Sequence, residues 1–140
     1  MKLDFLAYSL NDTITSFKKE LLYLNTTYYE RNMVYEHLNK PKTILGFNVD
    51  KSELCFSYEN LIAISIYLKE YKSFRNDLIE IIEILIDQKP TQIDLETFGN
   101  ENENKIYSWE FDDKVLGVIT KRDNGQLIIH SALSTQRFMW

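Results

Sequence analysis

Apolar side chains recur at alternating spacings of three and four residues in the first part of the chain. The series consists of Ile14, Phe17, Leu21, Leu24 and Tyr28, and it continues through Arg31 to Tyr35 and Leu38. This spacing places the side chains on one face of an α-helix. Asn11 or Asp12 can cap the first turn, and Pro41 can end the helix. We therefore expect helical structure within residues 1–40.

Two later segments also predict helices. Residues 58–71 follow Ser57 and are apolar on almost every side, which is typical of a buried helix. A third helix is expected to begin at Ser73 or Asn76 and to run to about Gln88, before Pro90. Its inward side chains are predicted to be Leu78, Ile81, Ile82, Leu85 and Ile86. Acidic side chains lie on its other side, so the outer face of this helix is expected to be negative.

The other segments alternate or cluster as strands do. Residues 43–49 and 53–56 flank the polar triplet at 50–52 and predict a β-hairpin, and residues 93–98 predict a further strand before a polar loop at 99–104. Three strands at residues 105–111, 115–121 and 126–132 predict an antiparallel meander, with Asn124-Gly125 as a type I′ turn. With two-residue loops, one face of the meander carries Tyr107, Trp109, Phe111, Leu116, Val118, Leu127 and Ile129.

The predicted fold class is α+β, in a single domain of residues 1–140. Three main helices, within residues 1–40 and 57–88, are expected to pack on an antiparallel sheet. The sheet is formed by residues 43–56 and 93–132 and ends in the C-terminal three-stranded meander. A chain of 140 residues with 44% apolar and 26% charged residues has the size and composition of one globular core.

The lack of a recognisable targeting signal and the single cysteine lead us to expect a cytoplasmic location. The N-terminus has an acid at Asp4 and lacks the long apolar run of a signal peptide, and no apolar run is long enough for a transmembrane helix. Cys55 is the single cysteine, so the chain cannot form an internal disulfide. We expect Cys55 to be a small buried side chain of an apolar strand.

Candidate catalytic residues are few. His37 is expected near a helix C-terminus, and His130 in a strand on the face opposite Leu127 and Ile129. Either imidazole could act as a general base, but neither has a nucleophile or metal ligand at a diagnostic spacing. The four glycines lie too far apart for a phosphate-binding loop. The sequence therefore predicts no catalytic residue, no metal site and no cofactor.

Charge is distributed unevenly along the chain. Residues 76–113 contain 11 acidic residues against Lys89 and Lys105, a net charge of −9, so the rest of the chain carries +4 of the overall −5. The negative net charge argues against general nucleic-acid binding. The residues predicted to form one partner-binding surface are Glu80, Glu83, Asp87, Glu101, Glu103, Glu110, Asp112 and Asp113. Such a surface accelerates association with a basic partner, although acidic residues also serve solubility alone.

These features favour a non-catalytic inhibitor that binds a protein. The best-fitting class is a bacterial immunity protein that neutralises a cognate basic toxin, such as a nuclease domain, by charge-complementary binding. Such a protein needs no direct contact with nucleic acid or membrane, and we expect a monomer or weak homodimer. One alternative is a phage-type inhibitor that mimics nucleic acid. A second is a small enzyme whose dispersed site pairs His130 with Asp112 or Glu110. A third is a homodimer with its interface along the 14–38 stripe.

Overall fold

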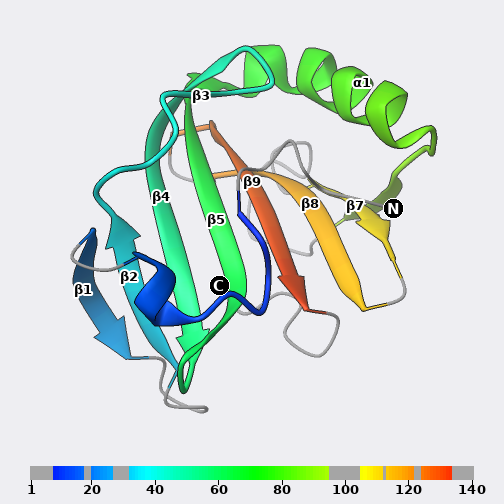
Figure 1. Cartoon of the computed structure of the whole chain (residues 1–140). Helices are drawn as coiled ribbons and strands as arrows, with labels where there is room; N and C mark the ends of the chain where they lie inside the picture. The colour runs from blue at the N-terminus through cyan, green and yellow to red at the C-terminus, as the bar shows by residue number, and fades with distance from the viewer. Residues whose placement is uncertain are drawn as a thin grey trace.

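A twisted, curved antiparallel sheet forms most of the protein in the computed structural model (Figure 1). The structure describes residues 8–17, 20–26, 32–94, 105–111, 113–121 and 124–133. Within these ranges the nine strands are β1 (Leu21–Thr26), β2 (Met33–His37), β3 (Thr43–Ile44), β4 (Phe47–Ser57), β5 (Asn60–Tyr71), β6 (Thr91–Asp94), β7 (Lys105–Glu110), β8 (Lys114–Thr120) and β9 (Gln126–Leu133). Their order in the sheet is β1-β2-β4-β5-β9-β8-β7-β6, with β3 paired to β4.

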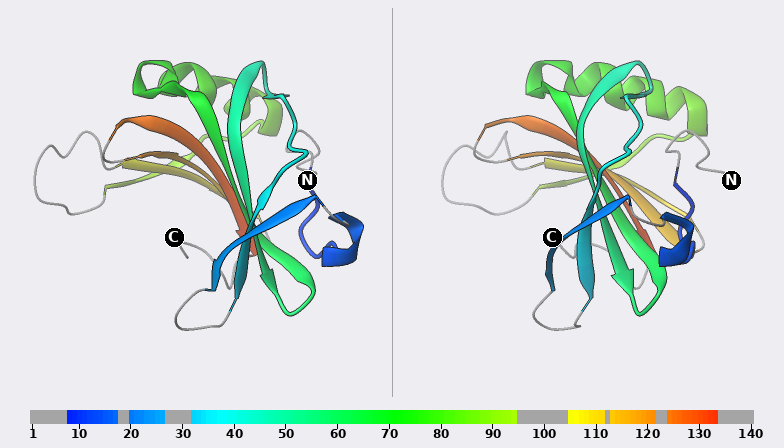
Figure 2. Two further views of the ribbon diagram at one scale, coloured as in Figure 1. Left: turned by 90° about the vertical axis from the view of Figure 1, so that its left-hand side faces the viewer. Right: turned by 60° about the vertical axis from the view of Figure 1, so that its left-hand side comes forward.

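A single α-helix in the described ranges, α1 (Arg75–Ile86), connects β5 to β6. A short 3₁₀ turn, η3 (Lys72–Phe74), precedes it. Because β6 lies at the far edge of the sheet, this connection passes across β9, β8 and β7, and α1 lies over one end of the curved sheet (Figures 1 and 2). No helix in the described part of the chain has the length and apolarity that crossing a bilayer requires.

The main core lies on one face of the sheet, where α1 covers one part of it and residues 8–17 pack against another. Trp109 and Phe56, its largest side chains, are fully buried, and Leu78 and Ile82 of α1 pack in the same cluster. The register aligns Tyr107 with Val118 and Trp109 with Leu116, as expected from the alternation of the meander. A smaller cluster on the opposite face contains Ile106, Ile119 and Ile128 with Tyr67 beside them. Strands β7 to β9 are therefore apolar on both faces.

The prediction of three helices packed on a sheet is wrong. Residues 58–71, expected as a buried helix, instead supply β5, which lies between β4 and β9 in the middle of the sheet. A strand that is buried on both faces is continuously apolar, as a buried helix is, so periodicity cannot separate the two. The β-branched residues Ile62, Ile64 and Ile66 favour the strand.

The first predicted helix is also replaced by other elements. The apolar series from Ile14 to Leu38 passes through the 3₁₀ turn η2 (Ile14–Phe17), then β1 and β2. Its three- and four-residue spacing joins side chains of separate elements, so it does not describe one helical face. His37, expected near a helix C-terminus, is the last residue of β2.

The predicted hairpin at residues 43–56 turns at a different place. The chain reverses at Leu45 and Gly46, whose φ angles are +55° and +84°, and β3 then pairs with β4. The expected turn at residues 50–52 lies inside β4, where a register shift between Val49 and Lys51 accommodates the polar triplet. Gly46 suits the turn because a residue without Cβ adopts positive φ at little cost.

The third helix and the C-terminal meander are confirmed. Helix α1 lies where the amphipathic pattern places it, and β7, β8 and β9 pair in antiparallel order. The last turn includes Gly125 at φ +76°, but four residues rather than two separate Lys121 from Gln126. Of the predicted strand at 93–98, residues 93 and 94 belong to β6; residues 95–98 and the loop at 99–104 lie outside the described residues.

Candidate functional site

Helix α1 combines acidic and apolar side chains on its outer face. Leu78, Ile79, Ile82 and Ile86 are buried against the sheet. On the outside, Ile84 is 71% exposed and Leu85 is 56% exposed. The prediction that Leu85 points into the core is therefore wrong. The exposed apolar pair distinguishes this outer face from a helix face that is polar throughout.

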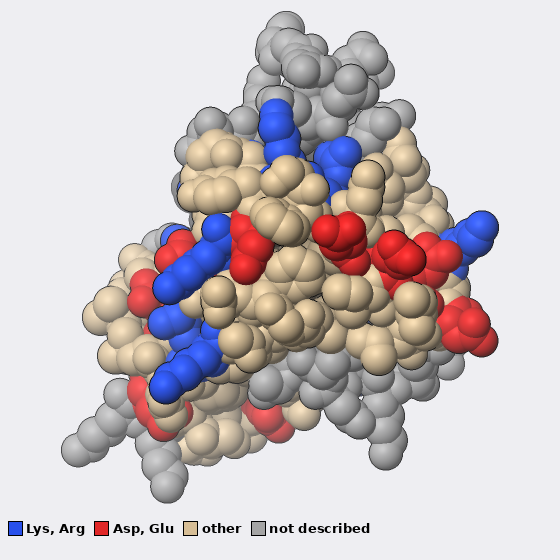
Figure 3. Space-filling view, turned by 90° about the horizontal axis from the view of Figure 1, so that it is seen from above, with Lys and Arg blue, Asp and Glu red and all other residues tan. Residues whose placement is uncertain are grey.

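The carboxylates of α1 surround the exposed isoleucine. At about 100° per residue, Asp77 and Glu80 lie within about 40° of Ile84 around the helix axis, and Asp87 follows as the C-cap residue. Asp77, Glu80 and Asp87 are exposed, and Glu83 is half-buried. Seen from above, acidic side chains form a row across this face of the molecule, and basic side chains lie above the row and at both of its ends (Figure 3). We refer to Asp77, Glu80, Glu83, Ile84, Leu85 and Asp87 as the α1 outer face.

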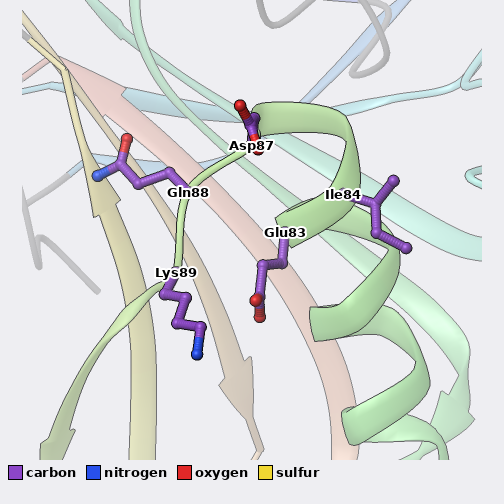
Figure 4. Close-up of a pocket in the computed structure, with 5 residues that line it drawn as sticks. All are labelled: Glu83, Ile84, Asp87, Gln88 and Lys89. Carbon is purple, nitrogen blue, oxygen red and sulfur yellow. The ribbon is translucent and has the colours of Figure 1, made fainter.

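A shallow hollow of about 270 Å³ lies at the C-terminal end of α1. Its lining residues are Glu83, Ile84, Asp87, Gln88 and Lys89 (Figure 4). Figure 4 shows the side chains of Glu83 and Lys89 extending toward the same side, while Ile84 projects from another side of the helix. The hollow therefore places carboxylates beside the carbonyl end of the helix, which carries partial negative charge.

The end of α1 is held in a defined geometry. Asp87 adopts a left-handed conformation at φ +58°, and its N–H donates to the Glu83 carbonyl at 2.8 Å. The indole N–H of the buried Trp109 donates to the Gln88 carbonyl at 2.8 Å. These bonds connect the exit of the helix to β7, so the position of the hollow is fixed by the core.

The structure gathers only part of the predicted acidic surface. Glu80, Glu83 and Asp87 lie together on α1, as expected from their spacing. Glu110 follows Trp109 in β7, and because successive strand residues alternate, it projects from the opposite face of the sheet. Asp113 is exposed beside the start of β8. The predicted residues Glu101, Glu103 and Asp112 lie outside the described residues.

Three contributors to the α1 outer face were not singled out from the sequence. Asp77, Ile84 and Leu85 belong to it in the structure. Ile84 could have been found, because the helical angle already places it on the same side as Glu80. Leu85 lies on the flank of the buried stripe, where a helical wheel does not decide between core and solvent.

His130, the proposed acid–base residue of the enzyme alternative, is a buried imidazole. It lies in β9, its Nδ1 is 2.9 Å from the Ser65 hydroxyl, and it is 3% exposed. Burial lowers the pKa of His130 to about 3, so the ring is neutral at neutral pH. Its predicted partner Glu110 is on β7, which β8 separates from β9. Asp112, the other predicted partner, is outside the described residues.

A second histidine lies in a hydrogen-bonded group with Tyr8 and Glu20. The His37 Nδ1 is 2.7 Å from the Tyr8 hydroxyl, and its Nε2 is 3.2 Å from a Glu20 carboxylate oxygen. Burial raises the pKa of Tyr8 above 10.0, as does the Glu20 charge, while the Ser52 hydroxyl acts in the opposite direction. A phenol of this kind stays protonated at neutral pH and is a poor nucleophile.

The surroundings of His37 indicate a structural role for this group. Phe17 packs edge-on against the His37 ring at 5.4 Å between centroids, and the imidazole is buried. The two contacts join Tyr8 and Glu20 to the end of β2, over sequence separations of 29 and 17 residues. Sequence spacing gave no signal for them, because the three side chains come from separate elements.

The thiol of Cys55 is a further reactive group. Cys55 lies in β4 and is only partly buried, so the expectation of a small buried side chain is wrong. Across the described ranges, His, Cys, Asp and Glu side chains do not form a group of three that could hold a metal ion.

Comparisons of the chain with protein-family models, curated proteins and solved structures give no match.

Proposed function

We propose that this protein is a non-catalytic binding protein that docks a basic protein against the α1 outer face. The observation that carries the proposal is the exposure of Ile84 and Leu85 among carboxylates, on a helix whose other side is fixed in the core. Protein interfaces commonly join a central apolar anchor to a polar or charged rim. Because the helix is already ordered, binding through its apolar anchor and charged rim costs less conformational entropy.

The charge of the α1 outer face determines the kind of partner. Glu83 and Asp87 act together with the negative end of the helix dipole at the C-terminal end of α1, and Asp77 and Glu80 extend the negative charge toward its N-terminus. They attract a surface rich in Lys and Arg and accelerate its association, while burial of Ile84 and Leu85 slows dissociation. The hollow beside Ile84 is lined by the Glu83 and Asp87 carboxylates together with Lys89, and its carboxylates can bind the cationic head of a partner Lys or Arg side chain.

A toxin nuclease domain is the partner class that this chemistry favours. A nuclease needs positive charge beside its active site to bind phosphates. An acidic helix docked there competes with the nucleic acid for the same charges, without catalysis or a cofactor. Inhibition by occupation of this kind is the mechanism expected of an immunity protein.

The test compares bait proteins that differ only in charge position. Wild type, Glu80→Lys/Asp87→Lys and Glu59→Lys/Asp113→Lys are used to capture proteins from a lysate of the source cells at low and moderate salt. The control pair carries the same charge change at exposed sites away from α1. We expect a basic protein, captured in a salt-sensitive manner by wild type and control but at least about tenfold more weakly by the α1 variant.

Three outcomes contradict the proposal. The α1 variant and the control capture the same proteins equally well, the protein lost from the α1 variant is acidic, or none of the captured proteins distinguishes the three baits. Equal melting temperatures of the three baits ensure that the comparison reports binding rather than folding.

A further inference from the structure

Strand β1 forms one end of the sheet and presents apolar side chains to solvent. In the described part of the chain β1 pairs with β2 on one side and has no strand on the other. Leu22 is 51% exposed and Tyr23 is 49% exposed, and Leu24 and Met33 are exposed as well. The outer edge of such a strand offers backbone N–H and C=O groups to another strand.

The two ends of the sheet differ in how they resist further pairing. Strand β6, at the other end, is four residues long and reads Thr-Gln-Ile-Asp, with exposed Thr91 and Gln92. Strand β1 reads Leu-Leu-Tyr-Leu-Asn-Thr and contains no charged residue and no proline. Edge strands that avoid association usually carry a charge, a proline or a bulge, or are very short. Strand β6 is very short, whereas β1 has only a register shift against β2 between Tyr23 and Asn25, which leaves residues 21–23 as a regular stretch for a partner strand.

The chemistry of β1 selects a second copy of this chain as its partner. Antiparallel strands pair with alternating hydrogen-bond pairs, so a strand edge is complementary to its own copy across a two-fold axis. Each protein carries a net charge of −5, but the paired segment itself is uncharged, so no like charges face each other along the strand. A basic partner, by contrast, finds no charge on β1 to complement its own.

Aromatic packing connects this edge to the core. The Tyr23 ring contacts Tyr35 at 5.6 Å between centroids, and Tyr35 contacts Phe56 at 5.8 Å, both edge to face. Tyr23 is therefore oriented by the partly buried Tyr35 and is itself 49% exposed. A second copy would cover this half-exposed ring together with Leu22 and Leu24.

We propose that two copies of this protein associate through antiparallel pairing of β1 with β1, which extends the sheet across a two-fold axis. Helix α1 lies on the connection from β5 to β6, away from β1, and stays accessible in such a dimer (Figure 1). The proposal does not rest on the function assigned to α1. The two surfaces together allow an assembly of two copies with two partners.

Sedimentation velocity over a concentration series tests the pairing. The range runs from roughly 1 to several hundred micromolar, where weak dimers dissociate. The variant Leu22→Lys/Leu24→Lys places lysines on the paired edge, and Ile84→Lys/Leu85→Lys makes the same change at exposed positions of α1. We expect a dimer for wild type and the α1 variant, and at least about tenfold weaker dimerisation for the β1 variant.

A second measurement is independent of any substitution. Hydrogen exchange of wild-type protein should show that protection of β1 backbone amides rises with concentration, while protection of the β4 amides stays constant. The proposal is overturned by a monomer at every concentration, by a dimer that persists in the β1 variant, or by open-ended larger assemblies. The last result would indicate pairing of β1 with a different edge, such as β6, in place of closed two-fold pairing.

Discussion

At the scale of single residues, burial determines how the titratable side chains behave. His130 is enclosed in the sheet beside Ser65, and burial lowers its pKa to about 3. A histidine in an unfolded chain has a pKa of about 6.5. As the pH falls, the unfolded chain therefore binds a proton well before folded His130 does, and folding becomes less favourable.

This difference predicts a specific pH dependence of stability. The contribution of His130 is fully present above about pH 6.5 and is lost progressively toward pH 3. At pH 4.5 the loss amounts to roughly 2–3 kcal/mol relative to pH 7. Urea unfolding of wild type and His130→Gln at both pH values measures this loss. Between pH 7 and pH 4.5, the free energy of unfolding of the variant should fall by roughly 2–3 kcal/mol less than that of wild type. His130→Asn serves as a second variant, and an equal loss in wild type and both variants would contradict the prediction.

Tyr8 supplies a second prediction at this scale. Tyr8→Phe removes the hydroxyl that lies 2.7 Å from His37 Nδ1 and leaves a buried imidazole nitrogen without that partner. We expect a loss of about 1–2 kcal/mol in the free energy of unfolding. The control Tyr58→Phe removes the hydroxyl of a tyrosine that is 95% exposed and should change stability very little. Equal effects of both variants on urea unfolding would refute the structural role of the Tyr8–His37 contact.

At the scale of elements, two isoleucines of α1 that are two positions apart have different roles. Ile82 is fully buried in the core, whereas Ile84 is largely exposed on the outer face. Ile82 therefore anchors the helix in the core, whereas Ile84 is accessible to a partner. The hydrogen bond from Trp109 to Gln88 holds the end of the helix in the same way.

The two isoleucines give a matched prediction. Ile82→Ala should lower the free energy of unfolding by about 2–5 kcal/mol, because it leaves a cavity in the core. Ile84→Ala should change stability by no more than about 0.5 kcal/mol but weaken binding of the captured partner by about 1–2 kcal/mol. Urea unfolding and calorimetric titration measure the two effects. If Ile84→Ala left the affinity unchanged, Ile84 would not be the anchor of the interface.

At the scale of the whole molecule, the sequence predicted the elements whose signals are local. Helix α1 has a polar and an apolar side over its own length, and the meander has alternation and an Asn-Gly turn. Strand β5 was missed because its burial on both faces depends on neighbours that are distant in the sequence. The pattern in residues 14–38 is produced by three elements, and only the fold reveals where each ends.

The candidate site, like the fold, was predicted only where its signal is local in the sequence. Glu80, Glu83 and Asp87 were predicted to share a surface because helical spacing alone brings them together. Whether Ile84 and Leu85 are exposed depends on how α1 docks on the sheet, which the sequence does not state. Glu110 was assigned to the same surface by proximity in the chain, but strand alternation directs it to the other face.

Docking of a basic protein on the α1 outer face is most directly tested by a hydrogen-exchange footprint. Exchange is measured for the protein alone and in its complex with the captured partner, purified in one-to-one stoichiometry. The account predicts increased protection across residues 75–89, with little change in residues 47–57 of β4. Protection that appears elsewhere while residues 75–89 exchange as they do in the free protein would contradict it.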